Sequence, residues 1–288
     1  MMPFDCSTLG GRAPTTLVRA RSLSHHALQW AARAARANLA AVPDDSYLSM
    51  EWDAAHALLL SQPLASNDGE IRIGLDIAGL ALTLWRGKVC LDTFELSGRR
   101  DSVVGVWLDS ALRTLGLKPA SDVRLPYAVA ASSVSRGGAY NSNGEGEALH
   151  ELARWFGTAA DLLGQVSVQL SEAYPGTGPV RCWPHHFNMV FLVALAGDSA
   201  EPTTSAGIGF SPGDEHYPQP YVYLSSSPRL NSTDLPPLPA PGHWHVQGFV
   251  GAVVTGEEIL MLSDRTRDLR GFIGAAFDIV RTRVAGSS

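Results

Sequence analysis

Residues 71–96 read IRIGLDIAGLALTLWRGKVCLDTFEL, and this stretch decides the expected fold. Apolar side chains alternate with other residues along Ile71–Ile77, which is the pattern of a half-buried strand. Ala78-Gly79 supplies a two-residue turn into a second apolar run, Leu80–Trp85. A further turn at residues 86–88 leads into Val89–Leu96. The stretch therefore predicts three neighbouring antiparallel strands joined by short turns.

Helices are expected on both sides of these strands. One is expected over Ser22–Val42, where Ser24 is a suitable capping residue and Pro43 stops the pattern. Another is expected over Ser102–Leu117, where Asp101 provides an acidic first turn. The first half of the chain therefore reads as helix, about four strands and helix.

The second half repeats this order of elements. Apolar residues at helical spacing predict a long helix over about Glu145–Tyr174 and a final helix over about Asp264–Val284. Strands are expected between them near Val180–Leu195, Ser205–Phe210, Tyr221–Ser225 and His245–Val254. We therefore expect an α+β fold with antiparallel sheets, helices on one face, and two pseudo-repeated helix–four strands–helix halves.

The turn-rich segments divide the chain into four parts. Residues 1–20 are expected to form a loose N-terminal arm, and residues 21–118 the first α+β half. Residues 119–144 are rich in Gly, Pro, Ser and Asn, which is typical of a linker. Residues 145–288 are expected to form the second α+β half.

The composition narrows the class of protein. The chain is 45% hydrophobic and 17% charged, so it has material for a core, and its net charge of -6 gives no reason to expect nucleic acid as a partner. The longest apolar run, near residues 189–196, is too short to span a bilayer. Cys6, Cys90 and Cys182 are too few and too far apart for a disulfide framework, and the first residues do not read as a signal peptide. We therefore expect a cytoplasmic protein without a membrane partner.

Three segments of the second half are candidates for a functional site, because five of the nine histidines lie between residues 185 and 245. Each also carries aromatic residues and a Gly or Pro. The segments are Trp183-Pro184-His185-His186-Phe187, Gly213-Asp214-Glu215-His216-Tyr217 and Gly242-His243-Trp244-His245.

Strand alternation selects among these histidines. His243 and His245 lie two residues apart, so they share a face with Gln247, and such a pair is suited to supply two imidazole ligands. A strand start whose imidazoles only hydrogen-bond to loops explains the same spacing equally well. His185 and His186 would point to opposite faces, and His186 is the preferred site residue because the face of His185 is aromatic.

The loop between Pro212 and Pro218 supplies acidic groups. Glu215 is the expected fourth metal ligand or general base, and Asp214 and His216 are expected to assist in catalysis. A solvated turn with an acidic tip is the alternative.

The leading hypothesis is a metal-dependent enzyme that acts on a small molecule. One divalent zinc, iron, nickel or copper ion would be bound by four side chains: His186, His243, His245 and Glu215. The rival is a metal-free acid–base enzyme or ligand-binding protein that uses the same cleft. In both, the substrate-binding residues are Trp183, Tyr217, Tyr221, Trp244 and Gln247. A third reading is a structural polar cluster with no catalytic role.

The motifs present and absent in the sequence also bear on nucleotide cofactors and on partners. It has no phosphate loop, Rossmann glycine fingerprint or Gly-x-Ser-x-Gly motif, so no nucleotide cofactor is expected. A small-molecule ligand is the expected partner, and the apolar helix faces are compatible with a homodimer.

Three segments resemble a large family of uncharacterised conserved bacterial proteins, a domain of unknown function. They are Leu28-Gln29-Trp30, Val180-Arg181-Cys182-Trp183-Pro184-His185-His186-Phe187-Asn188 and Gly209-Phe210-Ser211-Pro212-Gly213. Members of that family carry a Leu-His-Leu-Trp-like first helix, a Pro-Val-His-Phe-Phe-Trp-Gly-Ser-Phe-Asp-like strand and a Gly-Phe-Trp-Pro-Gly-like loop, and here Ser211 stands in place of the Trp of the loop. The resemblance implies a bacterial protein with shared architecture and a shared position for the site. It assigns no catalytic residues.

Overall fold

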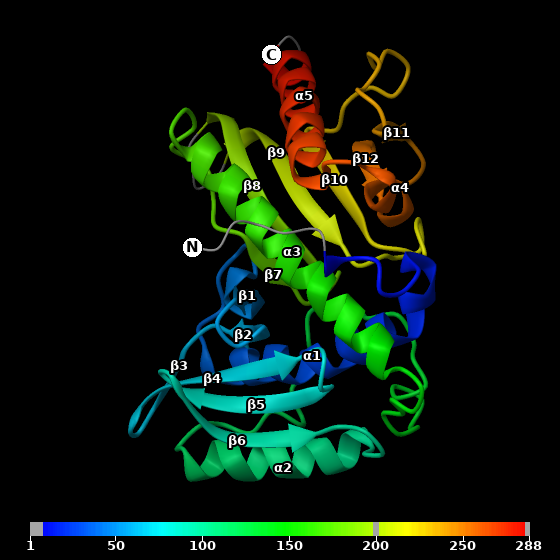
Figure 1. The fold of residues 1–288 in the computed structure, drawn as a ribbon. Helices are drawn as coiled ribbons and strands as arrows, with labels where there is room; N and C mark the ends of the chain where they lie inside the picture. Colours follow the sequence, from blue (N-terminus) through cyan, green and yellow to red (C-terminus); the bar gives the residue numbers. More distant parts are fainter. Residues whose placement is uncertain (1–7, 198–201, 286–288) are drawn as a thin grey trace. The chain divides into compact units, whose positions relative to one another are not determined.

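The computed structural model describes residues 8–197 and 202–285, and its fold is α+β (Figure 1). The chain forms two compact units. Unit 1 comprises Met1–Thr15, Trp155–Val180 and Asn188–Ser288, and unit 2 comprises Thr16–Arg154 and Arg181–Phe187. Residues 119–144, expected to link two halves, therefore lie within unit 2.

The sheet of unit 2 contains the expected meander. Strands β4 (Gly69–Asp76), β5 (Ala81–Arg86) and β6 (Val89–Glu95) are antiparallel neighbours, with Ile73 opposite Leu84 in the register. The prediction from residues 71–96 is confirmed. The sheet continues on the other side of β4 in the order β2, β1, β7, and β3 also pairs with β4. These strands are β1 (Met50–Asp53), β2 (Leu58–Ser61), β3 (Leu64–Ser66) and β7 (Arg181–Trp183).

Two helices belong wholly or mainly to unit 2. Helix α1 (Val18–Asn38) packs against β2 and β4 and buries an almost continuous run of small and apolar side chains, while α2 (Asp101–Thr114) follows β6. Short 3-10 turns, η2 (Pro14–Leu17) and η3 (Ser46–Leu48), flank α1.

The first helix is displaced from the expected position. It begins at Val18, so part of the expected N-terminal arm is helical, and Leu9 and Leu17 are buried. It ends before Leu39, which is extended. A helix continued through Pro43 would lose the hydrogen bond to the Leu39 carbonyl, and the proline ring would clash with that carbonyl. Residues 1–7 of the expected arm lie outside the described residues.

The sheet of unit 1 has the order β11, β12, β10, β9, β8, and its pairs are antiparallel. The strands are β8 (Asn188–Gly197), β9 (Pro202–Ser211), β10 (Tyr221–Ser227), β11 (His243–His245) and β12 (Gly251–Thr255). Helix α5 (Arg265–Ala285) packs on β9 and β10, and the short helix α4 (Gly256–Met261) follows β12. The rings of Trp155 and Phe156 in α3 (Gly146–Ser171) contact Phe210 of β9.

The expected strand over Val180–Leu195 is interrupted, which corrects that prediction. Strand β7 ends at Trp183 and β8 begins at Asn188. Between them, the N–H of Phe187 donates to the carbonyl of Trp183 at 2.7 Å, and Phe187 has a positive φ of 57°. Pro184 has no N–H for a sheet, so the segment turns. The alternation rule therefore does not apply to His185 and His186.

The order of elements agrees with the two expected halves, but the number of strands does not. Both halves of the chain begin and end with helices, and each carries six described strands instead of about four. The extra strands are short, such as β3, β7 and β11, and short strands lack a readable alternation. The pseudo-repeat stays a prediction.

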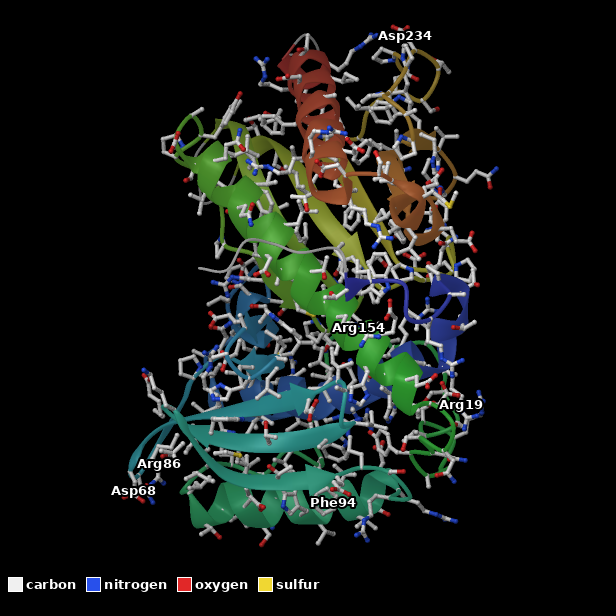
Figure 2. All side chains as sticks on the ribbon, in the orientation of Figure 1. Arg19, Asp68, Arg86, Phe94, Arg154 and Asp234 are labelled. Carbon is white, nitrogen blue, oxygen red and sulfur yellow. The ribbon has the colours of Figure 1, made fainter. Side chains whose placement is uncertain are left out.

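Charged side chains lie at the ends of several elements. Arg86 at the end of β5 lies 3.7 Å from Asp68 in the β3–β4 turn, and the two are neighbours in Figure 2. Such exposed pairs stabilise a fold by only about 0–1 kcal/mol.

Within residues 8–197 and 202–285, no helix has the length and apolar character needed to cross a bilayer.

Candidate functional site

Two of the three expected segments meet in unit 1. The hydroxyl of Tyr217 lies 3.1 Å from Nε2 of His243 and 3.0 Å from Nδ1 of His245. We call Asp214, Tyr217, His243, His245 and Glu258 the tyrosine–histidine cluster.

Strand pairing positions the two histidines. His243 and His245 of β11 pair with Val253 and Gly251 of β12, and residues two apart on a strand share a face. Their shared face was expected from the sequence. Trp244, between them, donates its indole N–H to the carbonyl of Pro236 at 2.7 Å.

Asp214 orders the loop that carries Tyr217. Its Oδ1 accepts from the backbone N–H groups of His216 at 2.9 Å and Tyr217 at 3.1 Å, and its Oδ2 accepts from the hydroxyl of Tyr221 at 2.5 Å. The rings of Tyr217 and Tyr221 lie 5.0 Å apart. Burial, with the charges of Glu258 and Asp214, raises the pKa of Tyr217, so its phenol keeps its proton at neutral pH.

The hydrogen bonds of the cluster run in one direction. Nε2 of His245 contacts the backbone carbonyl of Gln247, and a carbonyl only accepts, so Nε2 carries the proton. Nδ1 of the neutral His245 ring then accepts from the hydroxyl of Tyr217. The phenol oxygen in turn accepts from Nε2–H of His243. This order leaves Nδ1 of His243 with a lone pair.

Glu258 faces that lone pair. Its Oε1 lies 3.6 Å from Nδ1 of His243, while its Oε2 accepts from the backbone N–H of Thr255 at 2.7 Å and from its hydroxyl at 2.8 Å. These contacts form a capping box at the start of α4. A proton taken up at Nδ1 would therefore create an imidazolium beside a fixed carboxylate.

The sequence predicted only part of the role of Glu258. In the sequence, Glu257-Glu258 after Thr255-Gly256 favours the start of a helix, and the capping box confirms it. The contact of Glu258 with His243 was missed, because the Thr255-x-x-Glu258 pattern fixes the carboxylate locally but carries no information about β11.

A hollow of about 460 Å³ lies next to Glu258. It is lined by Ala240, Pro241, Glu257, Glu258, Met261 and Leu262. Met261 is 86% exposed, which is unusual for so large an apolar side chain and marks an open apolar wall. The hollow could hold a small molecule close to the carboxylate that faces His243.

His216 lies beside the cluster and forms one wall of an aromatic stack. Its ring is 5.0 Å from His245 and 5.3 Å from Phe249, and Phe249 stacks on His245 at 4.3 Å. Gly248 makes room for it, since a Cβ there would lie 2.5 Å from Cε1 of His216. His216 therefore packs against the ring of His245. Within the described residues, its ring makes no hydrogen bond to Tyr217, His243 or His245.

The remaining residues predicted for the site in unit 1 differ in what they contribute to the tyrosine–histidine cluster. The side chain of Glu215 is 84% exposed and lies 4.0 Å from Nε2 of His216, and within the described residues it has no contact with His243 or His245. Gln247 contributes its backbone carbonyl, while Tyr221 contributes its hydrogen bond to Asp214.

The third expected segment belongs to unit 2. His186 is exposed, and its ring lies 4.2 Å from that of His185, which in turn contacts Trp183 at 5.9 Å. Burial, followed by the neighbouring His186, lowers the pKa of His185 to about 4, so His185 is neutral at physiological pH. Binding of one ion by His186 together with His243 and His245 stays a prediction.

The grouping of His, Cys, Asp and Glu side chains is relevant to the predicted metal ion. Across the described ranges 8–197 and 202–285, no group of three or more His, Cys, Asp or Glu is placed to hold a metal ion. In the tyrosine–histidine cluster, Nε2 of His243 and Nδ1 of His245 both lie within hydrogen-bonding distance of the phenol oxygen of Tyr217.

The free cysteines do not add a nucleophile to this site. Cys182 is buried in unit 2, and its burial raises the pKa of the thiol, so the thiol keeps its proton at neutral pH.

Comparison with known proteins gives no further assignment. No family model, no curated protein and no solved structure matches the chain. The resemblance to the uncharacterised bacterial family is therefore untested.

Proposed function

We propose that the chain is a metal-independent acid–base enzyme that removes a proton from a small organic molecule, with His243 as the general base. The supporting observation is the hydroxyl of Tyr217, which lies within hydrogen-bonding distance of both His243 and His245. This is the metal-free rival hypothesis from the sequence, with His243 instead of Glu215 as the general base and Glu258 as the carboxylate beside it.

Each group has a defined task in the proposed reaction. The proton of the substrate moves to Nδ1 of His243, and the resulting imidazolium faces Oε1 of Glu258. Tyr217 orients the other side of the His243 ring, because its oxygen accepts a hydrogen bond from Nε2–H. Its own hydroxyl donates a hydrogen bond to Nδ1 of His245. In the triads of hydrolases the carboxylate bonds the N–H of the imidazole and the other nitrogen is the base. Here Glu258 faces the base nitrogen itself, so its charge would stabilise the imidazolium at the nitrogen that takes up the proton.

The hollow suggests the class of substrate. Pro241, Met261 and Leu262 offer apolar contacts, and Glu257 and Glu258 give the rim negative charge. An anionic substrate would be repelled there. A small, partly apolar molecule that is neutral or cationic matches these walls.

The test uses 5-nitrobenzisoxazole, a small aromatic molecule that opens when a base removes its ring C–H proton. The full chain is expected to accelerate the opening, and His243→Gln is expected to lower the rate by at least about tenfold, since a positioned base contributes roughly 10²–10⁴-fold. His150→Gln is the matched control, because His150 is exposed on α3, where its Nδ1 lies 2.8 Å from the carbonyl of Gly146. Equal rates for the two variants would contradict the proposal.

The metal-dependent hypothesis predicts a different result in the same assay. If His186, His243, His245 and Glu215 bind an ion, the rate falls after chelation and returns when a divalent metal is added. A rate that is unchanged by chelation supports the metal-independent reaction.

A further inference from the structure

A second hydrogen-bonded set of catalytic residue types lies in unit 2. Nε2 of His26 lies 2.7 Å from Oδ2 of Asp101, and Nδ1 of His26 lies 3.4 Å from Oγ of Ser132. These residues come from α1, from the start of α2 and from the segment 119–144. We call them the Asp101–His26–Ser132 triad.

The partners of His26 fix which nitrogen carries the proton. A carboxylate only accepts, so Nε2 of His26 holds a proton and donates it to Asp101. Nδ1 then has a lone pair, and the hydroxyl of Ser132 donates to it. Ser132 Oγ also accepts from the backbone N–H of Ser135 at 3.0 Å, which orients the hydroxyl. The order serine, imidazole, carboxylate is that of a nucleophile, its base and the group that orients the base.

Asp101 is held firmly in the charged form. Its Oδ1 accepts from the indole of Trp30 at 3.1 Å and from the hydroxyl of Tyr140 at 2.9 Å. Burial alone would raise the pKa of Asp101, but its contacts with His26, Tyr140 and Trp30 outweigh burial and hold the pKa below its usual value. A charged Asp101 can stabilise an imidazolium at His26.

Two backbone donors lie directly after Ser132. Among the residues that the structure describes, no hydrogen-bond acceptor is found for the N–H groups of Ser133 and Val134. The N–H of the residue after a nucleophilic serine is a common donor to the oxyanion of a tetrahedral intermediate. The segment thus supplies both a nucleophile and donors for the charge that forms.

We propose that Ser132 is the nucleophile of an esterase site that accepts small acyl groups. Oγ of Ser132 forms a bond to the acyl carbon of the ester, and its proton moves to Nδ1 of His26. The bond from the acyl carbon to the alcohol oxygen then breaks, and that oxygen takes the proton from His26. Water attacks the acyl-serine, passes its proton through His26 to Ser132 Oγ, and releases the carboxylic acid.

The burial of the triad limits the acyl group. Ser132 is 6% exposed and His26 is 8% exposed, although Ala131 and Ser133 on either side of the serine are exposed. Only a small acyl group can reach a hydroxyl that is nearly covered. Acetyl esters are therefore expected to react faster than octanoyl esters.

The first experiment measures hydrolysis of p-nitrophenyl acetate by the full chain. Ser132→Ala is expected to lower the rate above background by at least about 100-fold, since loss of a triad nucleophile removes most of the catalysis. Ser110→Ala is the matched control, because Ser110 is exposed on α2. His150→Gln is expected to leave the rate unchanged, because His150 is exposed on α3 and belongs to neither proposed site.

The second experiment keeps the test decisive if Ser132→Ala does not fold. The wild-type chain is treated with a fluorophosphonate, which bonds covalently to activated serines, and the modified peptide is identified by mass spectrometry. One adduct at Ser132 is expected. An adduct at another residue, or none while a known serine hydrolase is labelled in parallel, overturns the proposal.

Discussion

A single hydroxyl group, that of Tyr217, determines how the two histidines of β11 behave. It contacts both imidazoles, and because a phenol has one proton it can donate to only one of them. The carbonyl of Gln247 decides the direction, since it requires a proton on Nε2 of His245. The reactive position of the cluster is therefore Nδ1 of His243, which faces Glu258.

His25 gives a prediction for stability against pH. Its burial, opposed by a hydrogen bond from Nε2 to the Pro184 carbonyl and reinforced by Arg21, His186 and His26, lowers its pKa to about 4. The unfolded chain binds a proton at His25 below its ordinary pKa of 6.5, whereas the folded chain does not. The free energy of unfolding is therefore expected to fall as the pH drops from about 6.5 to about 4, by up to about 3 kcal/mol from this residue.

The measurement is urea unfolding of the wild type and of His25→Gln at several pH values in that window. The variant should lose less stability on acidification than the wild type does, and the remaining slope should include His185, whose pKa is also lowered to about 4. His150→Gln, an exposed control, should keep the wild-type slope. An identical slope in wild type and His25→Gln would contradict the assignment.

At the scale of elements, close approach of strands constrains β9. A Cβ added at Gly209 would lie 2.6 Å from the ring of Tyr223 and 2.7 Å from the carbonyl of Met189. The carbonyl belongs to a neighbouring strand and cannot move freely. Gly209→Ala is therefore expected to lower the free energy of unfolding by about 1–3 kcal/mol.

Gly164 in α3 is the matched comparison. Its Cβ would meet nothing within 4 Å, and glycine weakens a helix interior. Gly164→Ala is expected to raise the free energy of unfolding by about 0.5–1 kcal/mol. Urea titrations of both variants check the pair, and a shift of the same sign in both would show that the local contacts do not control stability here.

The elements also show what sequence patterns can and cannot predict. The meander of β4, β5 and β6 was predictable because its turns are short and its strands follow each other in sequence. The shared face of His243 and His245 was predictable from alternation alone. The break at residues 184–187 was not, because an alternating aromatic and polar string reads as a strand whether or not Phe187 has a positive φ.

Contacts between distant segments could not be predicted either, because sequence patterns describe only neighbouring residues. In the sequence, His26 lies 75 residues from Asp101 and 106 residues from Ser132, and no local pattern links these positions. Glu258 read as a helix start and proved also to face His243. Local patterns specify strands and caps, but only tertiary packing brings these side chains together.

At the scale of the whole molecule, the metal content of the chain separates the two accounts of the histidines. We expect full-length protein purified without a tag to contain far less than one transition-metal ion per chain, because a phenol oxygen already lies between His243 and His245. Added zinc should leave the unfolding midpoint unchanged, since an ion that binds the folded state would raise it. Elemental analysis and unfolding with and without zinc make the measurement. Stoichiometric metal that is lost in His243→Ala would favour the metal-dependent hypothesis.

The direction of the hydrogen-bonded chain in the tyrosine–histidine cluster is the central claim, and nitrogen NMR of the histidine side chains tests it most directly. In the full chain, the neutral ring of His245 is expected to carry its proton on Nε2, and the first proton added to the His243 ring is expected at Nδ1. Tyr217→Phe removes the shared hydroxyl and keeps the ring, so it should change both signals, while Tyr174→Phe should change neither. A His245 ring that carries its proton on Nδ1 in the wild type would contradict the account.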